Sequence, residues 1–156
     1  MILVTIGTSE PFDRLLAALE LLPPEEELVL QCGTSSLIGP HRAHRIDYLA
    51  AAELAAEMRR ARAIVMHAGV GSIITALEQG RRPIVVPRLH RFGEAVDDHQ
   101  LALGRKLADI GLVRLVEDLA RLPAAVVRPP PELPRAPGGD GLVGELRSFL
   151  RGAVAG

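Results

Sequence analysis

The stretch from Ala63 to Glu78 constrains the fold of this chain more than any other. It reads AIVM, HAGVGS, IITALE, so an apolar strand-like segment passes through a turn with Gly69 and Gly71 into apolar residues at helical spacing. A strand, a glycine turn and a helix in this order aim the unpaired N–H groups of the helix at one point, where a phosphate is stabilised. The stretch therefore predicts a phosphate site at the carboxyl end of a strand.

The same spacing also has a purely structural explanation. A tight turn between a strand and a helix favours glycine, and Ser72 would then cap the helix with its hydroxyl. Two other nucleotide motifs do not fit, because Ile74 stands where a dinucleotide fingerprint needs its third glycine and no Gly-Lys-Ser/Thr of a P-loop exists. Spacing alone leaves the phosphate-binding turn and the structural turn open.

The rest of the chain repeats the alternation of apolar strand-like runs and amphipathic helices. This pattern predicts an α/β, Rossmann-like parallel sheet with helices on both faces, in which ligands bind beyond the carboxyl ends of the strands. Strands are expected at residues 1–6, 27–31, 44–48, 63–66, 82–87 and 112–116. Helices are expected at 12–22, at 50–62 and at 96–110, and a further helix directly follows the glycine turn.

Length and composition bound the possible functions. The 156 residues, 48% of them hydrophobic, suit one domain at 1–127, a flexible Pro- and Gly-rich segment at 128–141 and a C-terminal helix and tail at 142–156. The net charge is −1 and the 18 Lys and Arg are scattered, so no nucleic-acid partner is expected. No leader is recognised, and the apolar runs fall well short of the roughly 20 residues that span a bilayer. A cytoplasmic location is expected.

Two further polar loops are expected at the same edge of the sheet. Residues 7–10 follow the first predicted strand, where backbone amides and Thr8 would face a ligand from the other side, although a plain connection also accounts for them. Residues 88–100 concentrate charged and hydrogen-bonding groups. Within them His99 and Gln100 have no evident structural need, so they are candidates for holding sugar hydroxyls.

Metal-dependent and nucleophilic chemistry find little support in the sequence. His41 and His44 are isolated, and Asp97 and Asp98 are adjacent without the Asp-x-Asp spacing of metal-dependent glycosyltransferases. Asp97 is expected as a cap or first-turn acid of the following helix. No Gly-x-Ser-x-Gly elbow exists, and the lone Cys32 is expected as a buried small hydrophobe. No metal is predicted.

In order and spacing, the motifs resemble the C-terminal, donor-binding half of GT-B glycosyltransferases of the MurG type (family 28). The resemblance extends to stand-alone small catalytic subunits, namely PssE-like exopolysaccharide proteins and the small subunit of the dolichol-linked N-acetylglucosaminyltransferase. It covers Met1 to about Val116. The motifs that carry it are Val4-Thr-Ile-Gly-Thr8 with Phe12-Asp13, Gln31-Cys-Gly33, His67-Ala-Gly-Val-Gly-Ser72, Pro83-Ile-Val-Val-Pro-Arg88, Glu94 and Asp98-His-Gln100.

The resemblance implies a fold equivalent to the C-terminal half of a GT-B enzyme and a donor site for a UDP-sugar, with no cofactor and no metal requirement. It places the diphosphate at Gly7, Thr8, Gly69, Val70, Gly71 and Ser72. It places ribose and uracil at Gln31, Gly33 and Thr75, and the sugar at Arg88, Glu94, Asp98, His99 and Gln100. The chain departs from the family at Thr75, where complete enzymes carry a glutamate that grips the ribose hydroxyls. A weaker or differently arranged ribose contact follows.

The resemblance further implies an inverting transfer from a UDP-sugar to a lipid-linked saccharide, in exopolysaccharide or glycolipid synthesis. The chain has length for the donor half alone, so a membrane-anchored acceptor-binding subunit is the expected partner. That partner would supply the catalytic base and recruit the chain to the inner face of the cytoplasmic membrane.

Two alternatives remain open from the sequence. A non-catalytic nucleotide-binding regulatory subunit would keep the glycine turn and lose the sugar contacts, which Glu94 and Gln100 argue against. A self-sufficient sugar-nucleotide enzyme, such as an epimerase or hydrolase, would need its own acid and base, and only Asp98 with His99 offers them.

Overall fold

The computed structural model describes residues 1–36, 39–40, 42–134 and 140–155. They form a sheet of six strands, all parallel, in the order β3-β2-β1-β4-β5-β6. The order reverses direction at the β1–β4 pair, as in a doubly wound α/β fold. The strands are β1 (Ile2–Thr5), β2 (Leu28–Gln31), β3 (Ala43–Ile46), β4 (Ala63–His67), β5 (Ile84–Val86) and β6 (Arg114–Leu115).

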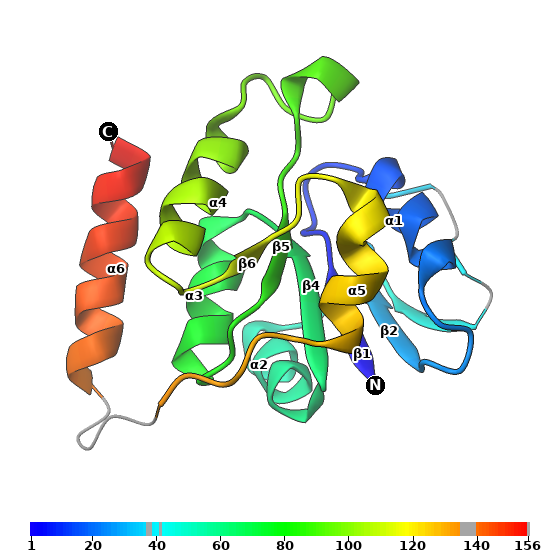
Figure 1. Cartoon of the computed structure of the whole chain (residues 1–156), viewed down its shortest axis with the longest axis horizontal. Coiled ribbons are helices and arrows are strands. Elements are labelled where there is room, and N and C mark those ends of the chain that lie inside the picture. The colour runs from blue at the N-terminus through cyan, green and yellow to red at the C-terminus, as the bar shows by residue number, and fades with distance from the viewer. Residues whose placement is uncertain (37–38, 41, 135–139, 156) are drawn as a thin grey trace.

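Helices cover both faces of the sheet (Figure 1). The α-helices are α1 (Asp13–Ala18), α2 (Ala51–Arg60), α3 (Val70–Glu78), α4 (His99–Asp109), α5 (Leu122–Val127) and α6 (Asp140–Ala155), and the 3-10 turns are η1 (Leu19–Leu21), η2 (His90–Phe92) and η3 (Leu119–Arg121). This confirms the predicted α/β architecture.

Successive residues along the strands pack alternately into two hydrophobic cores, one on each face of the sheet. Ile2 and Val4 of β1 pack towards α1 and α5, whereas Leu3 packs on the opposite face, towards α2, α3, α4 and α6. The four residues of β1 and of β2 are all buried, because helices cover both faces of these central strands. The continuous apolar runs that predicted the strands are therefore explained by burial on both sides.

Two elements differ from the sequence prediction. The helix predicted from residue 96 begins at His99, because Val96 lies in the preceding loop and is 93% exposed. Helix α5 was not predicted; it begins beside Pro123 and buries Leu122 and Val126 in the core that also contains α1. Tertiary packing thus stabilises a helix that is too short to be evident from its own sequence.

The segment that follows α5 makes contacts along the amino-terminal edge of the sheet. The backbone N–H of Leu133 donates to Gly80 O at 2.8 Å, and Glu132 pairs with Arg81. Residues 135–139 of the predicted flexible segment lie outside the described residues. Helix α6, which extends the C-terminal helix predicted from residue 142, packs against α3 and buries Leu146 and Leu150 in the second core.

Candidate functional site

The predicted site residues gather where the sheet order reverses. Strands β1 and β4 are neighbours, but the chain leaves β1 towards β2 and leaves β4 towards β5. The loops after these two strands therefore diverge and leave open the place where α/β proteins of this class bind their ligands. Gly7 follows β1 with φ +79°, a left-handed conformation that favours glycine, and Gly69 follows β4.

His67, the last residue of β4, lies beneath both loops. A β-carbon placed on Gly69 would lie 2.2 Å from its Nε2, and one placed on Gly7 would lie 3.0 Å from its Cε1. The imidazole thus excludes a side chain at Gly69, whose own φ of −89° would suit any residue, whereas Gly7 is required mainly by its positive φ. Sequence analysis used His67 only as part of a motif and missed it as a site residue, although its position between a strand and Gly69 was a usable signal.

The environment of His67 keeps its imidazole uncharged at neutral pH. Burial, assisted by the positive charge of Arg88, lowers its pKa from 6.5 to about 4. Its Nδ1 is buried and has no hydrogen-bond partner among the described residues. The floor of the site is therefore a neutral ring.

The amino-terminal end of α3 presents free backbone donors. The first intrahelical bond runs from Ile73 N–H to Gly69 O (3.0 Å), so the N–H groups of Val70, Gly71 and Ser72 precede the helical ladder. Gly69 is the N-cap and makes no side-chain bond, so the interpretation of Ser72 as the cap is wrong. A β-carbon on Gly71 would meet nothing within 4 Å, which leaves the backbone open to a ligand. This end of α3 suits an anion.

The hydroxyl of Thr75 is turned towards its own helix. It donates to Gly71 O at 3.0 Å, the i−4 carbonyl. Its proton is therefore used within α3, and only its oxygen lone pairs remain to accept a bond from a ribose hydroxyl.

The predicted uracil and ribose residues support the loop after β1. Gln31 is buried; Thr5 Oγ1 donates to its Oε1, and its Nε2 is 3.5 Å from both Gly7 O and Asp47 O. A β-carbon on Gly33, which has φ +51°, would lie 2.4 Å from Gly7 O. The buried Gln31 side chain thus contacts the protein-facing side of the Gly7 loop through Gly7 O, while Thr8, the next residue of the loop, is exposed.

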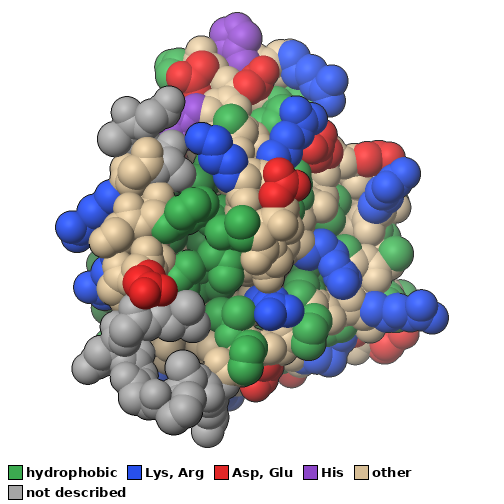
Figure 2. All heavy atoms as spheres, turned by 60° about the vertical axis from the view of Figure 1, so that its left-hand side comes forward, with side chains coloured by type: hydrophobic (Ala, Val, Ile, Leu, Met, Phe, Trp, Pro, Cys, Tyr) green, Lys and Arg blue, Asp and Glu red, His purple; other side chains and the backbone are tan. Residues whose placement is uncertain are grey.

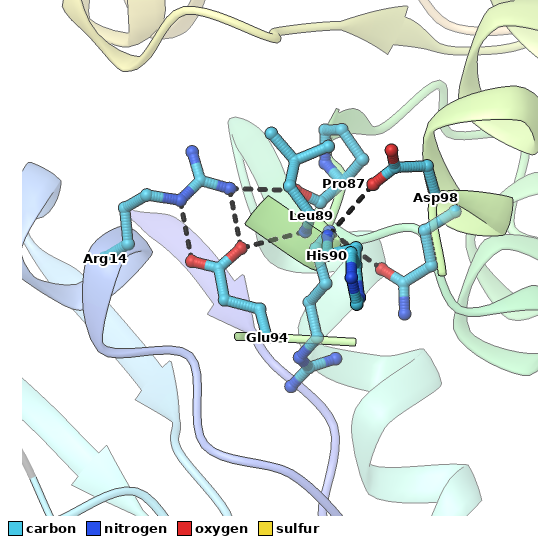
Figure 3. Close-up of polar contacts among 8 residues, drawn as sticks. Arg14, Pro87, Leu89, His90, Glu94 and Asp98 are labelled. Carbon is cyan, nitrogen blue, oxygen red and sulfur yellow. Dashed lines mark hydrogen bonds and ion pairs between the residues drawn. The ribbon is translucent and has the colours of Figure 1, made fainter. Parts of the chain in front are cut away.

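The predicted sugar residues lie on the loop between β5 and α4, residues 87–98, which we call the β5 loop, and at the start of α4 (Figure 3). Glu94 Oε2 accepts from Leu89 N at 2.9 Å, and Asp98 Oδ1 accepts from His90 N at 2.9 Å. Gln100 Oε1 accepts from Arg88 N at 3.0 Å. Gln100 therefore has a structural role that sequence analysis did not foresee, and its amide NH₂ is the part that can reach a ligand.

The five predicted sugar residues do not all face solvent. Arg88 is 4% exposed and donates to backbone carbonyls, and the Glu94 side chain is 9% exposed and forms an ion pair. Asp98 and His99 are exposed. The Asp97 carboxylate accepts from His99 N at 3.0 Å, but the N-cap position is taken by Asp98, which makes no side-chain cap bond, and the first turn of α4 holds no acidic residue. The expectation of Asp97 as the cap or a first-turn acid is therefore wrong.

Two further properties concern metals and membranes. The described residues contain no group of three or more His, Cys, Asp or Glu that could hold a metal ion. Among the helices of the described part, none combines the length and apolar character needed to cross a membrane.

Comparison with known proteins agrees with this geometry. Residues 1–129 match the Glycosyltransferase family 28 C-terminal domain, a span that contains the whole sheet and every predicted site residue. The chain belongs to this family. It is thus a glycosyltransferase domain, as its motifs implied.

A curated relative is the UDP-N-acetylglucosamine transferase subunit ALG13 of Yarrowia lipolytica, 29% identical over 124 residues. The match covers 69% of this chain and 60% of the relative, so the chain spans less than two thirds of that protein's length.

Solved structures share the fold. The glycosyltransferase of kitacinnamycin has a TM-score of 0.59 at 21% identity, over 98% of this chain and 40% of that one. SnogD from Streptomyces nogalater gives 0.57 at 22% identity, over 99% of this chain and 39% of its own. The solution structure of ALG13 gives 0.62 at 16% identity, and the match covers 96% of this chain and 94% of that one. The six-stranded sheet is thus the Rossmann-like half of GT-B glycosyltransferases.

Proposed function

We propose that this chain is the donor-binding catalytic subunit of a heteromeric, inverting glycosyltransferase. It binds a UDP-sugar, and a partner subunit anchored in the cytoplasmic membrane brings a lipid-linked saccharide to it as acceptor, in exopolysaccharide or glycolipid synthesis. The chain itself works at the cytoplasmic face of that membrane and needs no cofactor or metal.

One observation carries the donor site in this proposal. The N–H groups of Val70, Gly71 and Ser72 are free of the helical ladder and lie beside the Gly7 loop, over the neutral ring of His67. A diphosphate there accepts several N–H bonds and interacts with the positive end of the α3 dipole. The neutral His67 adds a polar ring atom without a buried charge of its own.

The sugar of the donor extends from the diphosphate towards the start of α4 in this proposal. The Gln100 amide and the exposed His99 ring are the groups that reach its hydroxyls, while Arg88 and Glu94 act by shaping the β5 loop. A self-sufficient enzyme is less well supported, because Asp98 already accepts from His90 N and His99 Nδ1 lies 4.0 Å from Asp97 Oδ1. The catalytic base is assigned to the partner.

Support for a partner comes from the relatives. The curated relative is named as a subunit of a transferase, and the ALG13 structure is nearly matched in length by this chain. The other two glycosyltransferase structures are more than twice as long, and the chain matches only about 40% of each. In this proposal the acceptor-binding half of the reaction comes from the partner subunit.

Calorimetry with nucleotides tests the donor site. We expect UDP to bind the purified chain and GDP and NAD not to bind, with a modest UDP affinity because the partner's side of the site is missing. NAD binding as tightly as UDP would refute the proposal, and so would the absence of any UDP binding to the folded chain.

A further inference from the structure

Two arginines cross in opposite directions between the loops that flank β4. One loop (residues 6–12, here the β1 loop) follows β1, and the β5 loop follows β5; β4 lies between these strands in the sheet. Arg14, which follows the β1 loop, reaches the β5 loop, and Arg88 of the β5 loop reaches the β1 loop. The two arginines thus connect the β1 loop and the β5 loop on either side of the carboxyl end of β4, where His67 lies.

Arg14 makes the more specific of the two contacts (Figure 3). Its Nε donates to Glu94 Oε1 at 2.7 Å and one terminal nitrogen donates to Glu94 Oε2 at 3.0 Å, a bidentate geometry. The same nitrogen donates to Pro87 O at 2.9 Å. The guanidinium also lies 4.7 Å from the centre of the Phe92 ring. Arg14 therefore contacts the beginning, the middle and the end of one turn of the β5 loop.

Arg88 holds the opposite loop. One terminal nitrogen donates to Ile6 O and to Glu10 O, each at 2.7 Å, and its guanidinium lies 4.9 Å from the centre of the Phe12 ring. The guanidinium of Arg14 lies 5.4 Å from that ring as well. Phe12 is fully buried, so it fixes both arginines against the core.

The β5 loop depends on side chains for its shape. Leu89 N and His90 N donate to the carboxylates of Glu94 and Asp98. Arg14 thereby orients the Glu94 carboxylate, which accepts a bond from Leu89 N. The preceding residue, Arg88, donates its own N–H to the Gln100 side chain. Without Arg14, a largely buried Glu94 would lose the guanidinium that binds both of its oxygens and would keep only the electrostatic attraction of Arg88. Oxygens left without these bonds are costly to bury, so the loop would rearrange to hydrate them.

We propose that Arg14 is a positioning residue for the donor sugar. Through Glu94 it sets the β5 loop, and the loop sets the Gln100 amide against the sugar hydroxyls, while the diphosphate contacts at α3 do not depend on it. This inference rests on the proposed function.

The experiment compares UDP with UDP-N-acetylglucosamine, the UDP-sugar in the name of the curated relative, by calorimetry on the whole chain. In Arg14→Met we expect UDP-N-acetylglucosamine to bind at least about fivefold more weakly, which corresponds to one lost hydrogen bond from Gln100. UDP affinity stays within about twofold of wild type, because the α3 amides are unaffected. Glu94→Gln gives the same pattern, and Arg14→Lys, which can keep one bond to Glu94, recovers part of the loss.

A control removes an exposed ion pair far from the β5 loop. Arg60 pairs with Glu57 at 3.0 Å on α2, at the end of the helix that leads into the amino-terminal end of β4. Arg60→Met should change neither affinity. Hydrogen exchange on Arg14→Met adds a local readout, since the amides of Leu89 and His90 should exchange faster while those of β1 and β4 remain protected.

The outcomes separate the alternatives. If Glu94 instead binds the sugar directly, Arg14→Met frees its carboxylate and UDP-N-acetylglucosamine binds equally well or better, which overturns the inference. Equal losses of UDP and UDP-N-acetylglucosamine affinity indicate a general structural role and overturn it too. If wild type binds no UDP, the proposed function itself fails; if it binds UDP and Arg14→Met has no effect, only the present inference fails.

Discussion

The substitution Gly71→Val separates nucleotide binding from folding. A β-carbon at Gly71 meets nothing within 4 Å, so the valine side chain projects into the open space over the amino-terminal end of α3. Valine is at least as good a helix former as glycine, and the free energy of unfolding should change by less than about 0.5 kcal/mol. The added isopropyl group covers the N–H groups that we assign to the diphosphate.

The expected loss of UDP affinity follows from those donors. A bond from a backbone N–H to a charged group contributes about 1.5 kcal/mol at the low end, so losing two weakens binding by about 3 kcal/mol, or roughly 100-fold or more. Calorimetry measures the affinity, and urea unfolding checks the fold. Gly144→Val in α6 is the matched control, since its β-carbon also meets nothing within 4 Å. A folded Gly71→Val protein with nearly unchanged UDP affinity would move the phosphate site elsewhere.

Three further predictions concern single side chains. Ser72→Ala should leave the free energy of unfolding unchanged, because Gly69 is the N-cap. It should weaken UDP binding by about 1 kcal/mol if the hydroxyl contacts phosphate. A lower stability in urea with an unchanged UDP affinity in calorimetry would contradict this. Arg81→Met should lower the free energy of unfolding by about 2 kcal/mol, because Arg81 donates to Ala61 O and Arg62 O at 2.6 and 3.2 Å. The control Arg60→Met removes an exposed ion pair and should lower it by less than about 0.5 kcal/mol. Equal effects of the two substitutions in urea unfolding would refute this prediction. His67 has a pKa of about 4 when folded and 6.5 as its ordinary value, so the unfolded chain gains its proton first, and stability falls by up to about 3 kcal/mol as pH drops from 6.5 towards 4. His67→Gln should remove that part of the pH dependence in urea titrations, and an unchanged slope would show that His67 does not cause it.

The sequence was most informative where a structural requirement is local. The central strands β1, β2, β4 and β5 were predicted because each is a short apolar run that is buried along almost all of its length. The glycine turn was recognisable because a β-carbon on Gly69 would collide with the His67 ring and the position of Gly71 is left open. Helix α5 was missed since the burial of Leu122 and Val126, rather than any capping or periodic signal, stabilises it. The start of α4 was placed too early because Val96 extends the apolar pattern into a loop where it is exposed.

The polar part of the site was harder to predict because it depends on partners distant in sequence. Arg14 and Glu94 are 80 positions apart, and neither the pair nor its effect on the β5 loop is visible before the fold brings β1 and β5 to one edge. The neutral state of His67 likewise depends on burial and on Arg88, which reaches across to the β1 loop. Sequence patterns identified these residue types and their neighbourhood, whereas direction and pairing required the tertiary structure.

The dependence of sugar transfer on a partner tests the central claim most directly. The purified chain is mixed with radiolabelled UDP-sugars and membranes of a heterologous host, with and without co-expression of a membrane-anchored protein encoded next to this chain's gene, and label in extracted lipid is counted. We predict incorporation only when the chain and the partner are both present, and its loss with Gly71→Val. Robust incorporation with the chain and host membranes alone would place the acceptor site and the base within these 156 residues and would contradict the account.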